Sequence, residues 1–176
     1  RGHRKYVFSA YVSHTTGYSV YWPTRTINDG RYKLIYHLRG DGDTSRNTWH
    51  QENPDADSKV VFDTPIKSGI EAAGPESVIY QAYARSQVPP TYELFDLQKD
   101  PGELHNLAGK EQYAEIEERL KNELHNWQEN IVNDPFADPE YLMNFTKDYK
   151  KKVEFFFDHR DDKKVVEGMS RLNRWG

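Results

Sequence analysis

The chain of 176 residues is 30% charged and 36% hydrophobic, which fits one domain with an appendage but is polar for a domain that folds alone. Its formal net charge of −4 provides no overall field for a polyanion, so we expect no nucleic-acid partner. The lack of cysteine excludes disulfides, a thiolate nucleophile and a zinc–thiolate site, and without an apolar run of about 18 residues we expect no membrane span.

The N-terminal part predicts one strand followed by a hairpin. Residues 6–12 are rich in aromatic and β-branched side chains, which suit a partly buried strand. The extended residues 18–22 and the alternating residues 31–38 flank Asn28-Asp29-Gly30, whose Asp-Gly pair tolerates the positive φ angles of a tight turn. We therefore expect an antiparallel hairpin here.

Residues 40–90 show no sustained periodicity, and Gly, Asp, Asn, Ser and Pro recur in them. We interpret this stretch as an irregular insertion, with short helical turns around 70–73 and 77–84. The groups Asp41-Gly42-Asp43 and Asp55-Ala56-Asp57 resemble fragments of calcium-binding loops. They lack the remaining oxygen ligands of such a loop, which favours a solvated loop over a metal site.

A third strand and one long helix follow. Residues 91–97 alternate as a strand does, and residues 99–103 supply turn chemistry. From about 110 to 132, apolar residues recur at intervals of three and four and so lie on one side of a helix. These residues, expected to pack on the sheet, are Tyr113, Ile116, Leu120, Leu124, Trp127 and Ile131. The charged residues between them, Glu117 included, are expected to face water.

The C-terminal part is expected to be a separate extension. Asn133-Asp134-Pro135 ends the long helix, and Asp138-Pro139 is typical of a new helix start, with Asp as the N-cap. Beyond Tyr149, lysines and phenylalanines alternate with aspartates. The aspartates offset the lysines, which favours a solvated or packing role over a nucleic-acid surface. We expect this tail to dock on the domain or to contact another chain, so an oligomer could form through it.

Together these elements predict an α+β fold. It comprises a small antiparallel sheet of three to four strands, one long amphipathic C-terminal helix packed on it, and a helical or irregular tail. The expected organisation is a subdomain over residues 1–135, with residues 40–90 as the insertion, and a charged-aromatic extension over residues 136–176.

Residues 92–108 read Tyr-Glu-Leu-Phe-Asp-Leu-Gln-Lys-Asp-Pro-Gly-Glu-Leu-His-Asn-Leu-Ala. This segment closely resembles the end of type I sulfatases, where a Tyr-Glu-Leu-Tyr-Asp-Leu strand precedes Asp-Pro, Glu, Asn-Leu and the C-terminal helix. Residues 21–25 and 31–35 resemble the family's aromatic-Pro-x-Arg and Tyr-Lys-Leu-Ile patterns. The aromatic-Pro-x-Arg form and residues 127–135 are most similar to the heparan N-sulfatase (N-sulfoglucosamine sulfohydrolase, sulfamidase) branch.

The resemblance implies that the chain is the C-terminal subdomain of a sulfatase and completes a substrate cleft for a sulfated, glycosaminoglycan-type sugar. In that family the nucleophile is a formylglycine made from the Cys of a Cys-x-Pro/Ala-x-Arg motif, and Asp and Asn side chains bind calcium. We expect both in a catalytic domain upstream of residue 1, which would be this chain's partner, and no activity or cofactor in this chain alone. Related bacterial enzymes are exported to the periplasm or secreted and animal ones are lysosomal, so we expect the same here.

Four residues are candidate substrate-binding residues, and none is a candidate catalytic residue or metal ligand. Arg25 follows the rigid Pro23 and could bind a sulfate or carboxylate in two-pronged geometry, with a structural ion pair as the alternative. His14 lies in a loop that in the family approaches the active-site mouth, where it could bind the sugar or donate a proton; the alternative is an ordinary surface histidine. Tyr21 and Trp22 could stack on a sugar ring or lie in the core.

Two other functions stay open. The chain could be a stand-alone module that binds a carbohydrate or a protein, and a closed polar surface would favour this. The upstream part could also belong to a phosphonate or phosphodiester hydrolase of the alkaline phosphatase superfamily. The aromatic-Pro-x-Arg pattern favours a sulfatase over that alternative.

Overall fold

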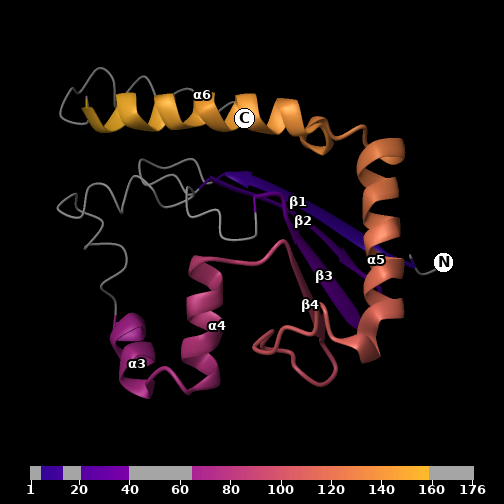
Figure 1. Cartoon of the computed structure of the whole chain (residues 1–176), viewed down its shortest axis with the longest axis vertical. Coiled ribbons are helices and arrows are strands. Elements are labelled where there is room, and N and C mark those ends of the chain that lie inside the picture. The colour runs from indigo at the N-terminus through magenta and orange to yellow at the C-terminus, as the bar shows by residue number, and fades with distance from the viewer. Residues whose placement is uncertain (1–4, 14–20, 40–64, 159–176) are drawn as a thin grey trace.

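The computed structural model describes residues 5–13, 21–39 and 65–158, and it confirms the α+β class (Figure 1). One antiparallel sheet has the strand order β1-β2-β3-β4. The strands are β1 (Val7–Ser13), β2 (Tyr21–Asn28), β3 (Tyr32–His37) and β4 (Tyr92–Asp96). The helices are α3 (Pro65–Ala73), α4 (Val78–Gln87), α5 (Ala114–Asn126) and α6 (Pro139–Asp158), with single turns η2 (Glu111–Tyr113), η3 (Trp127–Ile131) and η4 (Pro135–Ala137).

The expected hairpin joins β2 to β3. Asn28 and Asp29 form the turn with their own side chains: Gly30 N–H donates to Asn28 Oδ1 at 2.7 Å, and Tyr32 N–H donates to Asp29 Oδ1 at 2.7 Å. Gly30 has a φ of +96°, which a side chain would strain. The turn chemistry of the sequence therefore determines the register of these strands.

Strand β2 contains a proline because it bulges there. Tyr11 pairs with Thr24 and Ser13 pairs with Tyr21, so two residues of β2 lie opposite one residue of β1. A bulge is where a strand tolerates a residue without a backbone donor. The bulge at Trp22-Pro23 allows β2 to continue across the sheet beyond the segment expected from the sequence.

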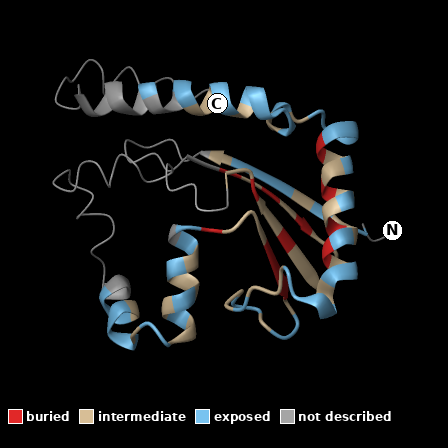
Figure 2. Cartoon of the chain, viewed as in Figure 1, coloured by how far each residue is buried: buried red, intermediate tan, exposed pale blue. Residues whose placement is uncertain are grey.

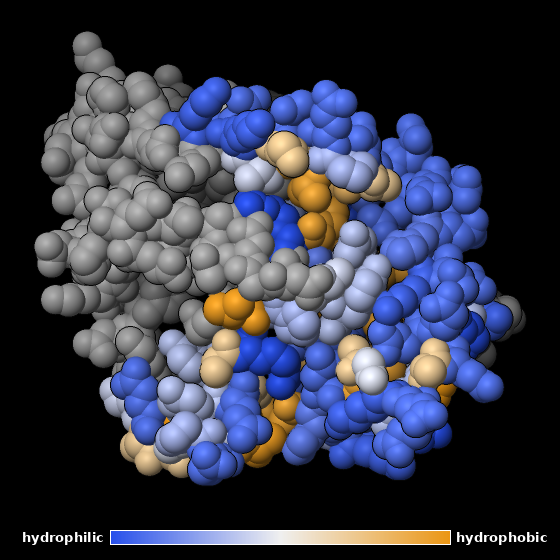
Figure 3. All heavy atoms as spheres, in the orientation of Figure 1, coloured by the Kyte–Doolittle hydropathy of each residue, from blue (hydrophilic) through white to orange (hydrophobic). Residues whose placement is uncertain are grey.

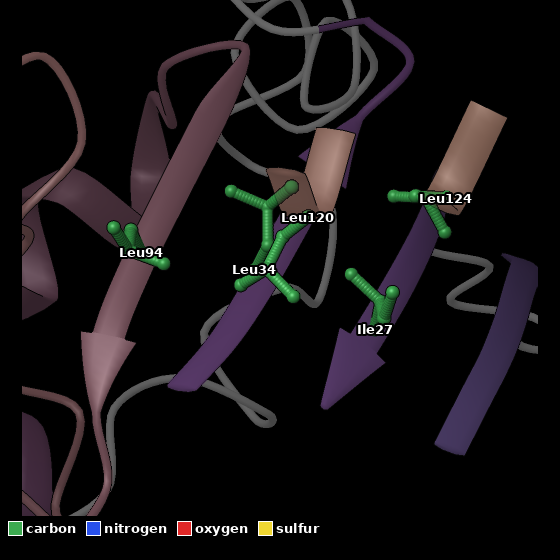
Figure 4. Close-up of a cluster of buried hydrophobic side chains, with 5 residues drawn as sticks. All are labelled: Ile27, Leu34, Leu94, Leu120 and Leu124. Carbon is green, nitrogen blue, oxygen red and sulfur yellow. The ribbon is translucent and has the colours of Figure 1, made fainter. Parts of the chain in front are cut away.

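The core lies between the sheet and α5, as the periodicity of the long helix predicts. Figure 4 shows the buried cluster from β2, β3, β4 and α5, all fully buried: Ile27, Leu34, Leu94, Leu120 and Leu124. Tyr113, Ile116 and Trp127 pack against this cluster and are partly buried. Figure 2 shows the same contrast, since buried residues gather on the strands and the facing side of α5, while α3 and α6 are mostly exposed.

The prediction that Ile131 belongs to the core is wrong, because Ile131 is 65% exposed. The end of the long helix is a π-helical turn, in which Val132 N–H donates to Trp127 O at 3.0 Å. A π turn contains more residues than an α turn, so the residues after Trp127 rotate away from the stripe. Gln128 takes the buried position there, with 2% exposure.

The expectation that Glu117 faces water is also wrong. Glu117 is 8% exposed and accepts a hydrogen bond from Gly109 N–H at 2.7 Å. It also pairs with Lys121 at 2.6 Å. Gly109 has a φ of +76°, so the chain turns there and directs its N–H toward the first turn of α5. Glu117 therefore fixes the entry of the chain into α5.

The second half of the segment expected to be irregular contains α3 and α4. Gly74, with a φ of +79°, separates the two helices, and the Ser77 hydroxyl caps α4 by accepting from Tyr80 N–H at 3.1 Å. The expected short turns are thus parts of two complete helices. Residues 40–64, with the two acidic groups compared with calcium loops, lie outside the described residues.

Helix α6 begins where Asp138-Pro139 predicts a new helix. Glu140 N–H donates to Asp138 Oδ1 at 2.9 Å, so Asp138 is the N-cap. Within the described ranges no helix is both long and apolar enough to cross a membrane.

Candidate functional site

Arg25 extends from β2 on the side of the sheet that α5 covers, and it is 2% exposed. Its Nε and Nη2 atoms donate to the two carboxylate oxygens of Asp134, the second over 2.9 Å. Its Nη1 atom donates to the carbonyl oxygens of Tyr11 at 3.1 Å and Thr24 at 2.9 Å. The guanidinium is thus held by one carboxylate and by both strands of the β1–β2 pair.

Asp134 is a suitable partner because it stays ionised. Burial raises the pKa of its carboxyl, but the hydrogen bonds from Arg25 and from Phe136 N–H bring that pKa below its ordinary value. The Phe136 ring lies against the guanidinium, with 5.3 Å between its centroid and Arg25 Cζ. The geometry therefore favours the structural ion pair over the sulfate-binding interpretation of Arg25. We call Arg25, Asp134 and Phe136 the Arg25 cluster.

Two of the other candidate residues, Tyr21 and Trp22, belong to the same end of the sheet. Tyr21 and Trp22 begin β2, and Tyr21 pairs with Ser13 at the end of β1. The side chains of Tyr21 and Trp22, and the whole of His14, lie outside the described part of the chain. Their roles in sugar binding stay predictions.

A second polar cluster, which the sequence analysis missed, lies on the opposite side of the sheet. His37 at the end of β3 and Glu93 in β4 are buried, and His37 Nε2 is 2.8 Å from Glu93 Oε2. Arg85 of α4 donates from Nε to Glu93 Oε1 at 2.5 Å. In Figure 1, α4 and α5 lie on opposite sides of the sheet. The sequence does contain a sign of this cluster. Successive residues of a strand point to opposite sides of the sheet, so Leu94 in the core places Glu93 on the other side.

Arg85 also connects α4 to the loop between β4 and α5. It donates to the carbonyl oxygens of Leu104 and Glu103, each at 3.1 Å. Burial raises the pKa of Glu93, but the hydrogen bonds from His37 and Arg85 lower that pKa below its ordinary value. Because donors occupy both carboxylate oxygens, Glu93 is placed as an anchor rather than as a proton acceptor.

The segment that resembles sulfatases is tied together by Asn106. Its Oδ1 accepts from Leu94 N–H and Ala108 N–H, both at 2.9 Å, and its Nδ2 donates to Tyr92 O at 3.3 Å. Leu107 N–H donates to Leu94 O at 2.8 Å. The Asn-Leu pair therefore satisfies the outer edge of β4 as an additional strand would.

The described residues do not form a calcium site. In the described ranges no group of three or more His, Asp or Glu side chains could hold a metal ion. The sequence has no cysteine from which a formylglycine could be made. The described hydrogen bonds and ion pairs position segments of the chain relative to one another.

Residues 79–130 match the family described as N-sulphoglucosamine sulphohydrolase, C-terminal. An ulvan-active sulfatase of Formosa agariphila is 28% identical over 151 residues, which cover 81% of this chain and 26% of that protein. A solved structure from Bacteroides thetaiotaomicron, assigned as a sulfatase, is 20% identical over 80% of this chain and 20% of its own, with a TM-score of 0.43. The chain thus spans about a quarter of the curated relative. The first two matches support a sulfatase C-terminal domain.

Proposed function

We propose that this chain is the C-terminal subdomain of a sulfatase and completes the cleft that binds a sulfated sugar. The observation that carries the proposal is the agreement between residues 79–130, which match the family, and the structure of that range. Within it, Asn106 seals the edge of β4, and Arg85 attaches α4 to the loop that follows. Hydrogen bonds of Asn106 and Arg85 therefore hold the segment that resembles the family together as a folded unit.

The chemistry supports placing the reaction elsewhere in the parent polypeptide. Cleavage of a sulfate ester or sulfamate needs a nucleophile for sulfur, a cation that polarises the sulfuryl oxygens and an acid for the leaving group. We assign the formylglycine and the calcium ion to a catalytic domain outside this chain. The curated relative is long enough for such a domain, because this chain covers only 26% of it.

The substrate is proposed at the level of a sulfated saccharide. The matched family is described by N-sulphoglucosamine and the curated relative by ulvan, so the two matches suggest different sugars. The aromatic-Pro-x-Arg pattern favours the heparan N-sulfatase branch and hence a glycosaminoglycan-type sugar. An exported protein, periplasmic or secreted in a bacterium and lysosomal in an animal, fits either substrate.

The test compares the full parent polypeptide with this chain alone. Sulfate release is measured from N-sulfated glucosamine, from ulvan and from a small aryl sulfate, with and without added calcium. We expect turnover by the parent and none by the chain alone, because the sequence has no cysteine to become a formylglycine and the residues that the structure describes form no metal site. The substrate that the parent cleaves fastest decides between the two sugar classes.

Two results would overturn the proposal. Turnover by the isolated chain would show that its own residues carry the chemistry. An inactive parent on all three substrates would remove the sulfatase assignment, and saccharide binding without turnover would then favour a stand-alone binding module.

A further inference from the structure

The two edges of the sheet differ in how they are covered. β1 forms one edge and β4 the other, because the strand order is β1-β2-β3-β4 (Figure 1). At the β4 edge, Leu107 N–H donates to Leu94 O at 2.8 Å, and Asn106 accepts from Leu94 N–H at 2.9 Å. The described residues pair β1 with β2 alone. The chain itself therefore closes the β4 edge, and no described strand closes the β1 edge.

β1 is also the least buried strand. None of its described side chains is buried, whereas β2, β3 and β4 each contain buried residues. Val7 is 61% exposed and Tyr11 is 39% exposed, and Ser9 and Ala10 between them are exposed as well. Because successive side chains of a strand point to opposite sides, solvent reaches β1 from both sides of the sheet. The Arg25 cluster holds β1 through the carbonyl oxygen of Tyr11, so this edge is exposed but fixed in place.

β1 lacks the features that protect an exposed edge in other proteins. Its sequence, Val-Phe-Ser-Ala-Tyr-Val-Ser, contains no charged residue and no proline, in a chain of which 30% is charged. In Figure 3 most of the described surface in view is hydrophilic, and hydrophobic residues appear in small groups. An uncharged edge strand of seven residues offers backbone groups and apolar side chains to a further strand. We therefore expect this edge to be covered in the native protein.

The distance along the chain indicates what covers β1. The proposed function assigns a catalytic domain to the polypeptide before Arg1, and β1 begins at Val7, only six residues later. Six extended residues span at most about 20 Å. A tether this short keeps the upstream domain near β1, at an effective concentration that a second copy in dilute solution does not reach. The curated relative is long enough to include such a domain, since this chain covers 26% of it.

We propose that β1 is the surface on which the upstream catalytic domain docks, through a segment of that domain that pairs with the free edge. This inference rests on the proposed function for the identity of the partner. Backbone hydrogen bonds supply the attachment, and the exposed side chains of Val7 and Tyr11 supply apolar contacts. Ser13 at the end of β1 pairs with Tyr21. Docking along β1 therefore brings the catalytic domain beside the candidate sugar-binding residues at the start of β2.

The first experiment is photo-cross-linking in the full parent polypeptide. The photo-reactive residue p-benzoylphenylalanine replaces Tyr11, and a mixture of isotopically labelled and unlabelled copies distinguishes contacts within one copy from contacts between copies. The control carries the same probe in place of Glu118, on the exposed side of α5. We expect the probe at position 11 to cross-link, within one copy, to residues upstream of Arg1. The probe at position 118 should give no such product.

The second experiment measures amide hydrogen exchange in the same polypeptide. We expect residues 7–13 to exchange about as slowly as residues 24–28 of β2, which have strands on both sides. Val7→Lys should speed exchange in β1 by about tenfold, because a lysine on an edge opposes the addition of a strand. Val88→Lys, the same change at a 43% exposed position at the end of α4, should leave exchange in β1 within about twofold of the wild type. Unchanged exchange in α5 shows that both variants keep their core.

Four results would overturn the inference. Cross-links from position 11 between copies would make β1 a dimer edge, and cross-links only to residues 14–176 would mean that this chain covers its own edge. The other two are the absence of any product from position 11 and fast exchange of residues 7–13 in the wild type.

The sulfate-release assay separates this inference from the proposed function. A parent that releases sulfate but joins its copies through β1 would refute the docking alone. A parent without sulfatase activity whose upstream part still cross-links to position 11 would refute the sulfatase assignment alone.

Discussion

Arg25 and Asp134 are 109 residues apart in the sequence and form a buried, two-pronged ion pair. Removing two charges from water is costly, and such a pair is tolerated when further hydrogen bonds satisfy the remaining polar atoms. Here the carbonyl oxygens of Tyr11 and Thr24 accept from Arg25, and Gln128 and Phe136 contact Asp134. The pair therefore depends on an intact set of neighbours.

We expect Asp134→Ala to lower the free energy of unfolding by about 3–5 kcal/mol, because it leaves the Arg25 guanidinium buried without a counter-charge. Asp138→Ala is the matched control, since it makes the same change in the same connection but at an exposed helix cap, with an expected loss of about 1 kcal/mol. Urea denaturation of both variants measures the difference. Equal losses would show that Arg25 finds another partner.

At the scale of the element, α5 and the π turn after it decide which residues reach the sheet. Leu120 and Leu124 follow the α-helical period and are fully buried. The period of the sequence predicts the same for Ile131, but the π turn intervenes. A hydrophobic stripe therefore predicts burial only as far as the helix keeps its regular geometry.

Leu120→Ala should destabilise the protein by about 2–5 kcal/mol, because it leaves a cavity in the core. Ile131→Ala, a similar deletion in the same long helix, should change the free energy of unfolding by at most about 0.5 kcal/mol, because Ile131 is largely exposed. Thermal or urea unfolding distinguishes the two. A large loss for Ile131→Ala would mean that another part of the protein covers this residue.

At the scale of the whole molecule, ionised carboxylates hold the elements together. Asp29 pairs with Arg119 of α5, Glu93 with Arg85 of α4, and Asp134 with Arg25 of β2. For Asp29, as for Glu93 and Asp134, burial raises the pKa, but hydrogen bonds from the partners leave it below its ordinary value. Each carboxylate thus attaches a helix or a connection to the sheet.

Because these pKa values are lower in the folded than in the unfolded protein, the folded state binds fewer protons in acid. The stabilisation is present above the unfolded values of 3.8 for Asp and 4.5 for Glu, and it is lost as the pH falls through the folded values. We expect similar stability at pH 7 and pH 5 and a decline below about pH 4, measured by urea denaturation. Glu93→Gln should make the decline shallower. Equal stability at pH 3 and pH 7 would contradict this account.

The sequence by itself determined the features that depend on neighbouring residues. Asn28-Asp29-Gly30 predicted the hairpin, the spacing of Ile116, Leu120 and Leu124 predicted the buried side of α5, and Asp138-Pro139 predicted the start of α6. Each pattern involves residues close together in the sequence, and the local backbone geometry allows such residues only a few conformations. The resemblance of residues 92–108 to sulfatases came from the same kind of local pattern.

Only the tertiary structure decided the contacts between distant residues. It paired Arg25 with Asp134, joined His37 and Arg85 to Glu93, and placed Ile131 in solvent. Such contacts depend on strand register, on the π turn and on how each helix packs, and no local pattern encodes these.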